Sequence, residues 1–167
     1  KKITIELKVY GLSKILIICS FVRVMGFFRI DVIKASETLP LREKVLWPGR
    51  PDMCVLAEDN ELLHYGAFAE DGGEIIGIIS YDTKKSSFRK LAVDSKYRRN
   101  GIGTALIQRC EEEAIERGHA HLVCHARQAQ NSFYLKRGMH AHGDSFLKYK
   151  GGDLYITMRK SLDFKKF

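Results

Sequence analysis

The chain has 167 residues, 45% of them hydrophobic and 29% charged, and it contains no internal repeat or low-complexity stretch. These values are ordinary for one soluble globular domain, long enough to bury a core without disulfides or metals. The formal net charge of +8 suits an anionic ligand such as a nucleotide. A nucleic-acid-binding protein usually concentrates its charge more strongly, so we expect no nucleic acid among the partners.

Residues 1–24 are expected to be a variable extension of a single domain that covers residues 25–167. The apolar run at 15–19 is too short to span a bilayer, and no small-x-small cleavage site follows it, so we expect no membrane partner. The chain begins with Lys1, whereas Met25 and Gly26 directly precede the first clear strand. We therefore interpret residues 1–24 as a non-native or upstream-translated extension, with an additional strand or helix as the alternative.

The first elements of the domain are a strand and a short helix. Alternating polar and apolar residues predict the strand over 28–33. The helix is expected over 39–46, because proline is tolerated in a first turn and Pro40 would then lie there. Residues 47–51 are rich in proline and glycine and are expected to form a loop.

Two apolar runs, at 62–68 and 74–81, flank the sequence Asp71-Gly72-Gly73. Glycine accepts the positive φ of a tight turn, so this pattern predicts an antiparallel hairpin.

An amphipathic helix is predicted over 102–117, where apolar residues recur at a spacing of four. Gly118 stands where a glycine commonly ends a helix. Strands are predicted on either side, over 88–93 and 121–125. The three elements form a βαβ unit, so the two strands should be parallel neighbours.

A second short helix is expected over 132–137, closed by Gly138, and two last strands near 146–148 and 154–158. The whole chain therefore predicts an α/β fold, with a mixed, mostly antiparallel central sheet around a parallel βαβ core.

Four cysteines, Cys19, Cys54, Cys110 and Cys124, have no C-x-x-C spacing among them. We expect reduced thiols in a cytoplasmic protein. His119 and His121 alternate along one strand but lack further ligands, so no metal is expected.

The turn that leads into the long helix has the residues of an anion site. Glycines at a helix start let an anion approach the unpaired backbone amides, and here Gly101 and Gly103 lie beside Arg98 and Arg99. The pattern is neither a P-loop, which needs a lysine, nor a dinucleotide fingerprint, since Leu106 replaces the small third residue. An ordinary helix-entry turn is the alternative.

Residues 91–106 resemble the signature of the GNAT superfamily of N-acetyltransferases. The pattern R/Q-x-x-G-x-G/A is matched by Arg98, Gly101 and Gly103. Residues 129–139 resemble the family's downstream motif, with Asn131, Tyr134 and Gly138 at the family's intervals. The resemblance covers about residues 28–160 and extends to a bacterial subgroup of small uncharacterised GNAT proteins.

This resemblance implies a GNAT-like fold, with a V-shaped splay between the strands at 88–93 and 121–125, and acetyl-CoA as co-substrate. Backbone groups of the first strand would pair with the pantetheine arm, and Asn131 would reach that arm or the adjacent phosphates. The residues implied in coenzyme binding are Leu91, Ala92, Val93, Arg98, Arg99, Asn100, Gly101, Ile102, Gly103, Thr104 and Asn131.

Two residues are catalytic candidates. Tyr134 would act as general acid toward the departing thiolate, with packing of its ring as the alternative role. The sequence does not identify the general base: His125 would accept a proton from the amine, but a histidine in a strand is more often structural, and a chain of water molecules is the alternative. His64 and Glu74 lie on the hairpin that would border the acceptor site.

The function expected is the transfer of an acetyl or other short acyl group from acyl-CoA to a primary amine, by direct attack in a ternary complex. A catalytically silent coenzyme A-binding module of the same fold is the alternative, and a basic nucleic-acid-binding domain is the third candidate. The sequence does not identify the amine acceptor, which is either a small molecule or a peptide. It also leaves undetermined which acyl chain is transferred and whether the protein forms a homodimer.

Overall fold

The computed structural model describes residues 28–70, 73–148 and 152–164. The strands are β1 (Phe28–Ile33), β2 (Leu63–Ala69), β3 (Ile75–Asp82), β4 (Ser87–Val93), β5 (His121–Arg127), β6 (His140–Ala141), β7 (Phe146–Leu147) and β8 (Leu154–Ser161). The α-helices are α1 (Ala35–Leu46), α2 (Ile102–Glu116) and α3 (Asn131–Leu135).

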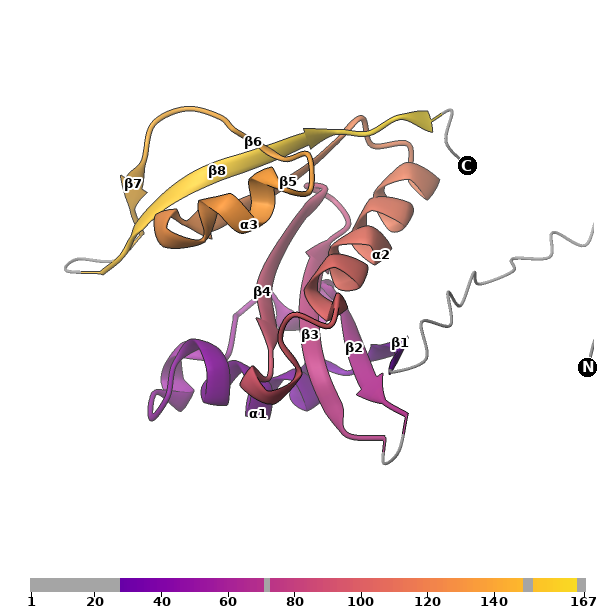
Figure 1. Ribbon diagram of the computed structural model, residues 1–167, viewed down its shortest axis with the longest axis vertical. Coiled ribbons are helices and arrows are strands. Elements are labelled where there is room, and N and C mark those ends of the chain that lie inside the picture. The colour runs from indigo at the N-terminus through magenta and orange to yellow at the C-terminus, as the bar shows by residue number, and fades with distance from the viewer. Residues whose placement is uncertain (1–27, 71–72, 149–151, 165–167) are drawn as a thin grey trace, which may run out of the picture.

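The described strands form one sheet in the order β1-β2-β3-β4-β5-β8-β6, with β7 pairing at β8 (Figure 1). Neighbouring strands are antiparallel except β4 and β5, which are parallel. This confirms the predicted mixed, mostly antiparallel sheet with one parallel pair. The parallel pair arises because α2 returns the chain to the same end of the sheet before β5 begins.

The strand at 28–33 and the hairpin of β2 and β3 are confirmed. Asp71 and Gly72 of the expected turn lie outside the described residues. Gly73 adopts a φ of +67°, the conformation for which glycine was expected there.

The predicted start of the first helix was wrong. α1 begins at Ala35, so Pro40 lies inside the helix rather than in its first turn. Two local bonds set the earlier start: the amide of Lys34 donates to the Glu37 carboxylate at 2.7 Å, and the Thr38 hydroxyl donates to the Ala35 carbonyl at 2.6 Å. These bonds satisfy polar groups at the helix start, and they outweighed the signal from proline.

The amphipathic helix is confirmed, and its apolar stripe forms much of the main core. Ile102, Leu106, Cys110 and Ala114 are each at most 2% exposed. They pack against β2, β3, β4 and β5 on one face of the sheet, whereas α1 packs through Leu41 on Ile78 and Ala92, in a second cluster. The helices α1 and α2 therefore cover opposite faces.

The last third of the chain departs from the prediction in three ways. α3 begins at Asn131 and ends at Leu135, β6 was not foreseen, and β8 lies next to β5, a neighbour for which the sequence made no prediction. The strand β8 pairs with β5 along its length, from His121 opposite Ser161 to Arg127 opposite Tyr155. Pairing between strands so distant in sequence leaves no local signal.

Cys54, Cys110 and Cys124 are free, buried thiols. Burial raises the pKa of Cys124 to about 12, so this thiol stays protonated at neutral pH. The predictions for Cys19 and for residues 1–24 fall outside the described residues. In the part of the chain that the structure describes, no helix is both long and apolar enough to cross a membrane.

Candidate functional site

The strands β4 and β5 pair over two positions and then part. Ser87 lies opposite Val123 and Phe88 opposite Cys124, and no further pair joins these strands among the described residues. Beyond this point β4 stays paired with β3, and β5 with β8. The two strands therefore diverge at the end where β4 leads toward α2 (Figure 1). We call the opening between their two backbones the slot.

A β-bulge in β4 lies where the strands part. Arg89 pairs with Ser80 and Ala92 with Ile78, so three steps along β4 match two along β3. The extra residue is Lys90, with a φ of +56°. A bulge bends its strand and increases the local twist, which turns the end of β4 away from β5.

The backbone of β4 presents amides to the slot. Asp94 donates its amide to the Ile76 carbonyl of β3 at 2.9 Å. Amide direction alternates along a strand, so the amides of Leu91 and Val93 point to the opposite edge, where β5 has departed. The amide of Ala92 points toward β3 instead, so Leu91 and Val93 supply the open edge.

The start of α2 forms a second set of free amides. Gly101 caps the helix with a φ of +80°, and the first helical bond runs from the Ala105 amide to the Gly101 carbonyl at 3.0 Å. The amides of residues 102–104 precede this first bond, so they have no partner within the hydrogen bonds of the helix. A Cβ at Gly101 would have no atom within 4 Å, so the space beside this residue is open.

Cations surround this helix start. Arg98, Arg99 and Asn100 are exposed, and Nε of Arg98 donates to the Val93 carbonyl at 3.3 Å, which ties Arg98 to the end of β4. Together with the positive end of the helix dipole, these arginines make the region attractive to an anion.

Arg137 is a further cation at this site that sequence reasoning missed. It donates to the Thr104 hydroxyl oxygen from Nε at 3.0 Å and from Nη2 at 2.5 Å. Its guanidinium lies 3.6 Å above the centre of the Phe133 ring. A Cβ on Gly103 would lie only 3.2 Å from the Phe133 ring, so the glycine allows α3 to pack closely on α2. Nothing local in the sequence relates residues so far apart.

α3 places Asn131 and Tyr134 beside the slot. Oδ1 of Asn131 is buried and has no hydrogen-bond partner among the described residues. The Tyr134 ring packs on Phe133 with centroids 5.0 Å apart and on Phe88 of β4 at 6.2 Å. Burial, with a smaller contribution from Cys124, raises the pKa of Tyr134 well above its usual value, so the hydroxyl keeps its proton.

His125 lies on the other face of the sheet from Tyr134. Cys124 belongs to the core under α2, so its neighbour His125 points to the opposite face, where it is exposed. Its Nδ1 lies 3.2 Å from the Thr157 hydroxyl, and its ring meets Phe146 edge-on at 5.2 Å. Desolvation and the positive charges of Lys148 and Arg89 lower the pKa of His125, which favours the neutral imidazole.

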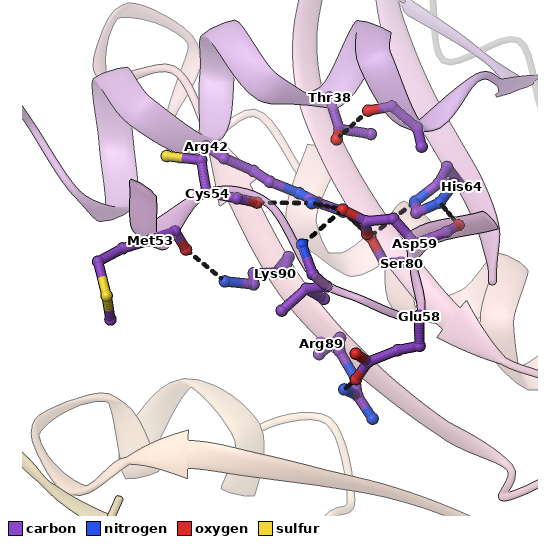
Figure 2. A network of polar contacts seen from close by, with 12 residues as sticks. Thr38, Arg42, Met53, Cys54, Glu58, Asp59, His64, Ser80, Arg89 and Lys90 are labelled. Atoms are coloured by element: carbon purple, nitrogen blue, oxygen red, sulfur yellow. Dashed lines mark hydrogen bonds and ion pairs between the residues drawn. The ribbon is translucent and has the colours of Figure 1, made fainter. Parts of the chain in front are cut away.

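The loop between α1 and β2 contacts two consecutive residues of β4, Arg89 and Lys90 (Figure 2). Lys90 donates to the Met53 carbonyl at 3.0 Å, and its ammonium lies 3.6 Å from the centre of the Trp47 ring. Arg89 forms an ion pair with Glu58. Sequence reasoning treated Arg89 and Lys90 only as strand residues, because the bulge that directs both toward this loop is set by the pairing with β3.

A buried network anchors this loop. The Arg42 guanidinium is fully buried and donates to both carboxylate oxygens of Asp59, at 2.7 and 2.9 Å (Figure 2). It also donates to the Cys54 carbonyl at 2.8 Å and to the Ser80 hydroxyl at 2.9 Å. Burial alone would raise the pKa of Asp59, but the bonds from Arg42 and from the Leu56 amide outweigh it and leave that pKa lowered.

His64 belongs to this network and is not free to act on a substrate. Nε2 lies 2.8 Å from the Asp59 carbonyl, which can only accept, so Nε2 carries a proton. Nδ1 lies 2.9 Å from the Ser80 hydroxyl. Both ring nitrogens are therefore engaged in holding the loop to β2 and β3, and Glu74 is exposed before β3.

A hollow of about 430 Å³ lies at the other end of β5, where β4 and β5 are still paired. It is lined by Lys85, Ser86, His119, Ala120, His121, Val123, His142, Thr157 and Arg159. His119 precedes β5 rather than lying in it, and its Nε2 is 2.8 Å from the Thr83 carbonyl. Among residues 28–70, 73–148 and 152–164, no three histidine, cysteine, aspartate or glutamate side chains are grouped to hold a metal ion.

Comparison with known proteins relates most of this chain to one family. Residues 55–162 match the family model described as "Acetyltransferase (GNAT) domain". Acetyltransferase ECA0875 of Pectobacterium atrosepticum is 36% identical over 94 residues, covering 54% of this chain and 67% of that protein. Uncharacterized protein YdhI of Bacillus subtilis is 34% identical over 99 residues, covering 54% of this chain and 59% of that protein. The chain thus matches about three fifths of the length of YdhI.

Among solved structures, an aminoglycoside 6'-N-acetyltransferase complexed with coenzyme A has a similar fold, with a TM-score of 0.63. The superposition covers 79% of this chain and 96% of that chain, at 19% sequence identity. Similarity at this level of identity establishes the fold alone.

Proposed function

This chain belongs to the GNAT acetyltransferase family, and we propose that it transfers an acetyl or other short acyl group from acyl-CoA to a primary amine. The amine would attack directly while both substrates lie in the slot, so proximity would supply much of the rate. The observation that carries this proposal is the slot itself: free amides line it at β4 and α2, and a neutral imidazole lies on its other side.

The residues at the start of α2 fit a diphosphate. The amides of Ile102, Gly103 and Thr104 precede the first helical hydrogen bond, and a Cβ at the adjacent Gly101 would have no atom within 4 Å. Arg98 and Arg99 would add positive charge from the exposed turn. We infer that this segment would hold the pyrophosphate of coenzyme A.

The edge of β4 fits an extended chain that carries amide groups. Leu91 and Val93 would pair with the pantetheine arm as an added strand. Oδ1 of Asn131 is a buried acceptor without a partner among the described residues, and such an atom is costly unless a ligand satisfies it. A pantetheine amide N–H would do so. Acyl-CoA, when bound, would supply an acyl group activated as a thioester.

Two side chains would move protons. His125, kept neutral by its surroundings, would accept the proton that the attacking amine loses. Tyr134, kept protonated by burial, would give a proton to the departing sulfur. They lie on opposite faces of β5, which suits an acceptor and a coenzyme that enter the slot from opposite faces.

The test is a comparison of Tyr134→Phe with Tyr65→Phe, using free-thiol release from acetyl-CoA with an amine panel. Among the described residues the Tyr134 hydroxyl has no hydrogen-bond partner, whereas the Tyr65 hydroxyl donates to Glu113 at 2.9 Å in the core. We expect Tyr134→Phe to lower kcat about 100-fold, in the range for a lost general acid, with little change in unfolding temperature. Tyr65→Phe should instead lower the unfolding temperature and leave kcat nearly unchanged.

Unaltered turnover in Tyr134→Phe would rule out its role as general acid. Binding of acetyl-CoA without thiol release from any amine would favour the alternative, a catalytically silent coenzyme A-binding module. His125→Gln should lower kcat/KM for the amine and remove the limb of the pH profile that His125 sets. If that limb persists in the variant, another group accepts the proton.

A further inference from the structure

We propose that the acceptor amine carries a carboxylate, held at the acceptor side of the slot by Arg89, Lys90 and Lys148. This inference rests on the proposed function and narrows it to a class of acceptor.

The cations stand directly beyond the point where the strands part. Phe88 and Cys124 form the last pair of β4 and β5, and both point into the core under α2. Side chains alternate along a strand, so the next residues, Arg89 and His125, point to the opposite face. The bulge places Lys90 beside Arg89 on this same side, where it meets Trp47 and Met53.

The positive charge here is only partly neutralised. Arg89 pairs with Glu58, and its Nη2 lies 4.0 Å from Asp82. Lys90 contacts the Met53 carbonyl and the Trp47 ring, and Lys148 lies 5.4 Å from the centre of the Tyr155 ring. Within the described part of the chain, no carboxylate lies within ion-pair distance of either lysine ammonium.

The cluster of Arg89, Lys90 and Lys148 keeps an excess of positive charge when the neighbouring charged groups are included. Arg127, at the end of β5, is neutralised by Asp153 at 3.2 Å. Burial, followed by the charges of Arg42 and Lys148, lowers the pKa of Lys90 to about 8. Desolvation and Arg89 likewise lower the pKa of Lys148, against a smaller opposite effect of Glu58. These groups therefore repel one another, and a bound anion would relieve the repulsion.

The lysines have an environment suited to selective binding. Lys90 is held against the loop that the buried Arg42 and Asp59 pair anchors, so its position is fixed before a ligand arrives (Figure 2). Aromatic rings of Trp47, Phe146 and Tyr155 lie among the cations. Such rings exclude water, and an ion pair is stronger when it is shielded from water.

Coenzyme A also carries anionic groups, so the experiment must separate the two sources of negative charge. The free amides proposed for the pyrophosphate lie at the start of α2, on the face of the sheet opposite to Arg89 and His125. A change at the basic cluster should therefore alter the KM for the acceptor and leave the KM for acetyl-CoA nearly constant.

The experiment measures free-thiol release from acetyl-CoA by the full chain with matched acceptors. Each set shares one chain length and contains an ω-amino acid, the corresponding alkylamine and the corresponding diamine, so only the charge at the far end differs. A second set compares α-amino acids with their amides. We expect kcat/KM for the carboxylate member to exceed that of its neutral partner about tenfold or more, as for a hydrogen bond between charged groups.

Lys148→Met and Lys90→Met should reduce this ratio about tenfold, and Lys148→Glu should shift the preference toward the diamine. Lys84→Met is the control, because Lys84 is an exposed lysine paired with Glu61 at 2.7 Å, in the turn that joins β3 to β4. It should leave the ratio unchanged.

Turnover that prefers the neutral or the cationic member would overturn this inference and leave the proposed function intact. A ratio that stays constant in both lysine variants would also overturn it, as would a change confined to the KM for acetyl-CoA. No thiol release with any amine would contradict the proposed function, and the inference with it.

Discussion

Gly101 and Gly118, at the two ends of α2, allow a controlled test of the proposed coenzyme site. Gly101 has a φ of +80° and Gly118 a φ of +75°, and a Cβ at either position would have no atom within 4 Å. Replacing either glycine with alanine therefore adds the same methyl group to the same strained conformation in open space. Only the methyl at Gly101 would stand beside the free amides at the helix start.

In the absence of ligand, the two substitutions should lower the free energy of unfolding by nearly equal amounts. A left-handed conformation costs a residue with a Cβ about 1–2 kcal/mol. For a domain of this size each kcal/mol lowers the unfolding temperature by about 2–4 °C. Gly101→Ala and Gly118→Ala should thus lose similar stability, and the difference between them in acetyl-CoA binding isolates the methyl group at the site.

The assay is thermal unfolding with and without acetyl-CoA. At a ligand concentration of 100 Kd, binding stabilises the native state by about 2.7 kcal/mol, and tenfold weaker binding reduces this to about 1.4 kcal/mol. We expect Gly101→Ala to lose at least half of the ligand-induced shift, and Gly118→Ala to keep all of it. Gly103 is less suitable, because its Cβ would press on Phe133 at 3.2 Å.

An undiminished shift in Gly101→Ala would refute the assignment of the pyrophosphate to these amides. A shift lost equally in both variants would indicate that strain in α2, rather than contact with the ligand, controls binding.

Two further predictions concern the loop and its lysine. Asp59→Ala should lower the free energy of unfolding by about 3 kcal/mol, measured by urea, because it leaves the fully buried Arg42 guanidinium without its carboxylate. Folding lowers the pKa of Asp59, so the stabilisation from its charge is fully present above pH 3.8 and is lost as the pH falls through the folded-state pKa. A difference between wild type and variant that does not shrink below pH 3.8 would contradict this. Lys90, with a pKa of about 8, faces Arg42 and Lys148, which lower that pKa, and Cys54 and Asp59, which raise it. The kcat/KM ratio of a carboxylate acceptor to its neutral partner should therefore fall as pH rises through about 8, whereas a ratio constant from pH 7 to 9 would exclude Lys90.

The local patterns of the sequence were sufficient for most elements of the fold. The apolar stripe of α2 and the glycines at its two ends determined that helix, because helix period and positive φ are properties of a short stretch of chain. The same holds for the hairpin of β2 and β3. The start of α1 was misjudged because hydrogen bonds made by Glu37 and Thr38 outweighed the signal of Pro40.

Candidate residues of the coenzyme site could be named from the sequence because they are contiguous: Arg98 to Thr104 form one turn, and Asn131 and Tyr134 lie on one short helix. The residues proposed for the acceptor side could not be named from the sequence. Its cations come from β4 and from the residue after β7, and Lys90 reaches the loop only because a bulge shifts its register against β3.

The sequence by itself thus predicted most of the helices and strands, and it singled out the turn that we propose as the anion site. The tertiary structure alone decided where β4 and β5 part, that β8 joins β5, and which charges meet across the slot. The physical reason is the distance along the chain over which the interactions act. Backbone conformation follows from neighbours along the chain, whereas strand pairing and charge balance depend on groups that only the folded chain brings together.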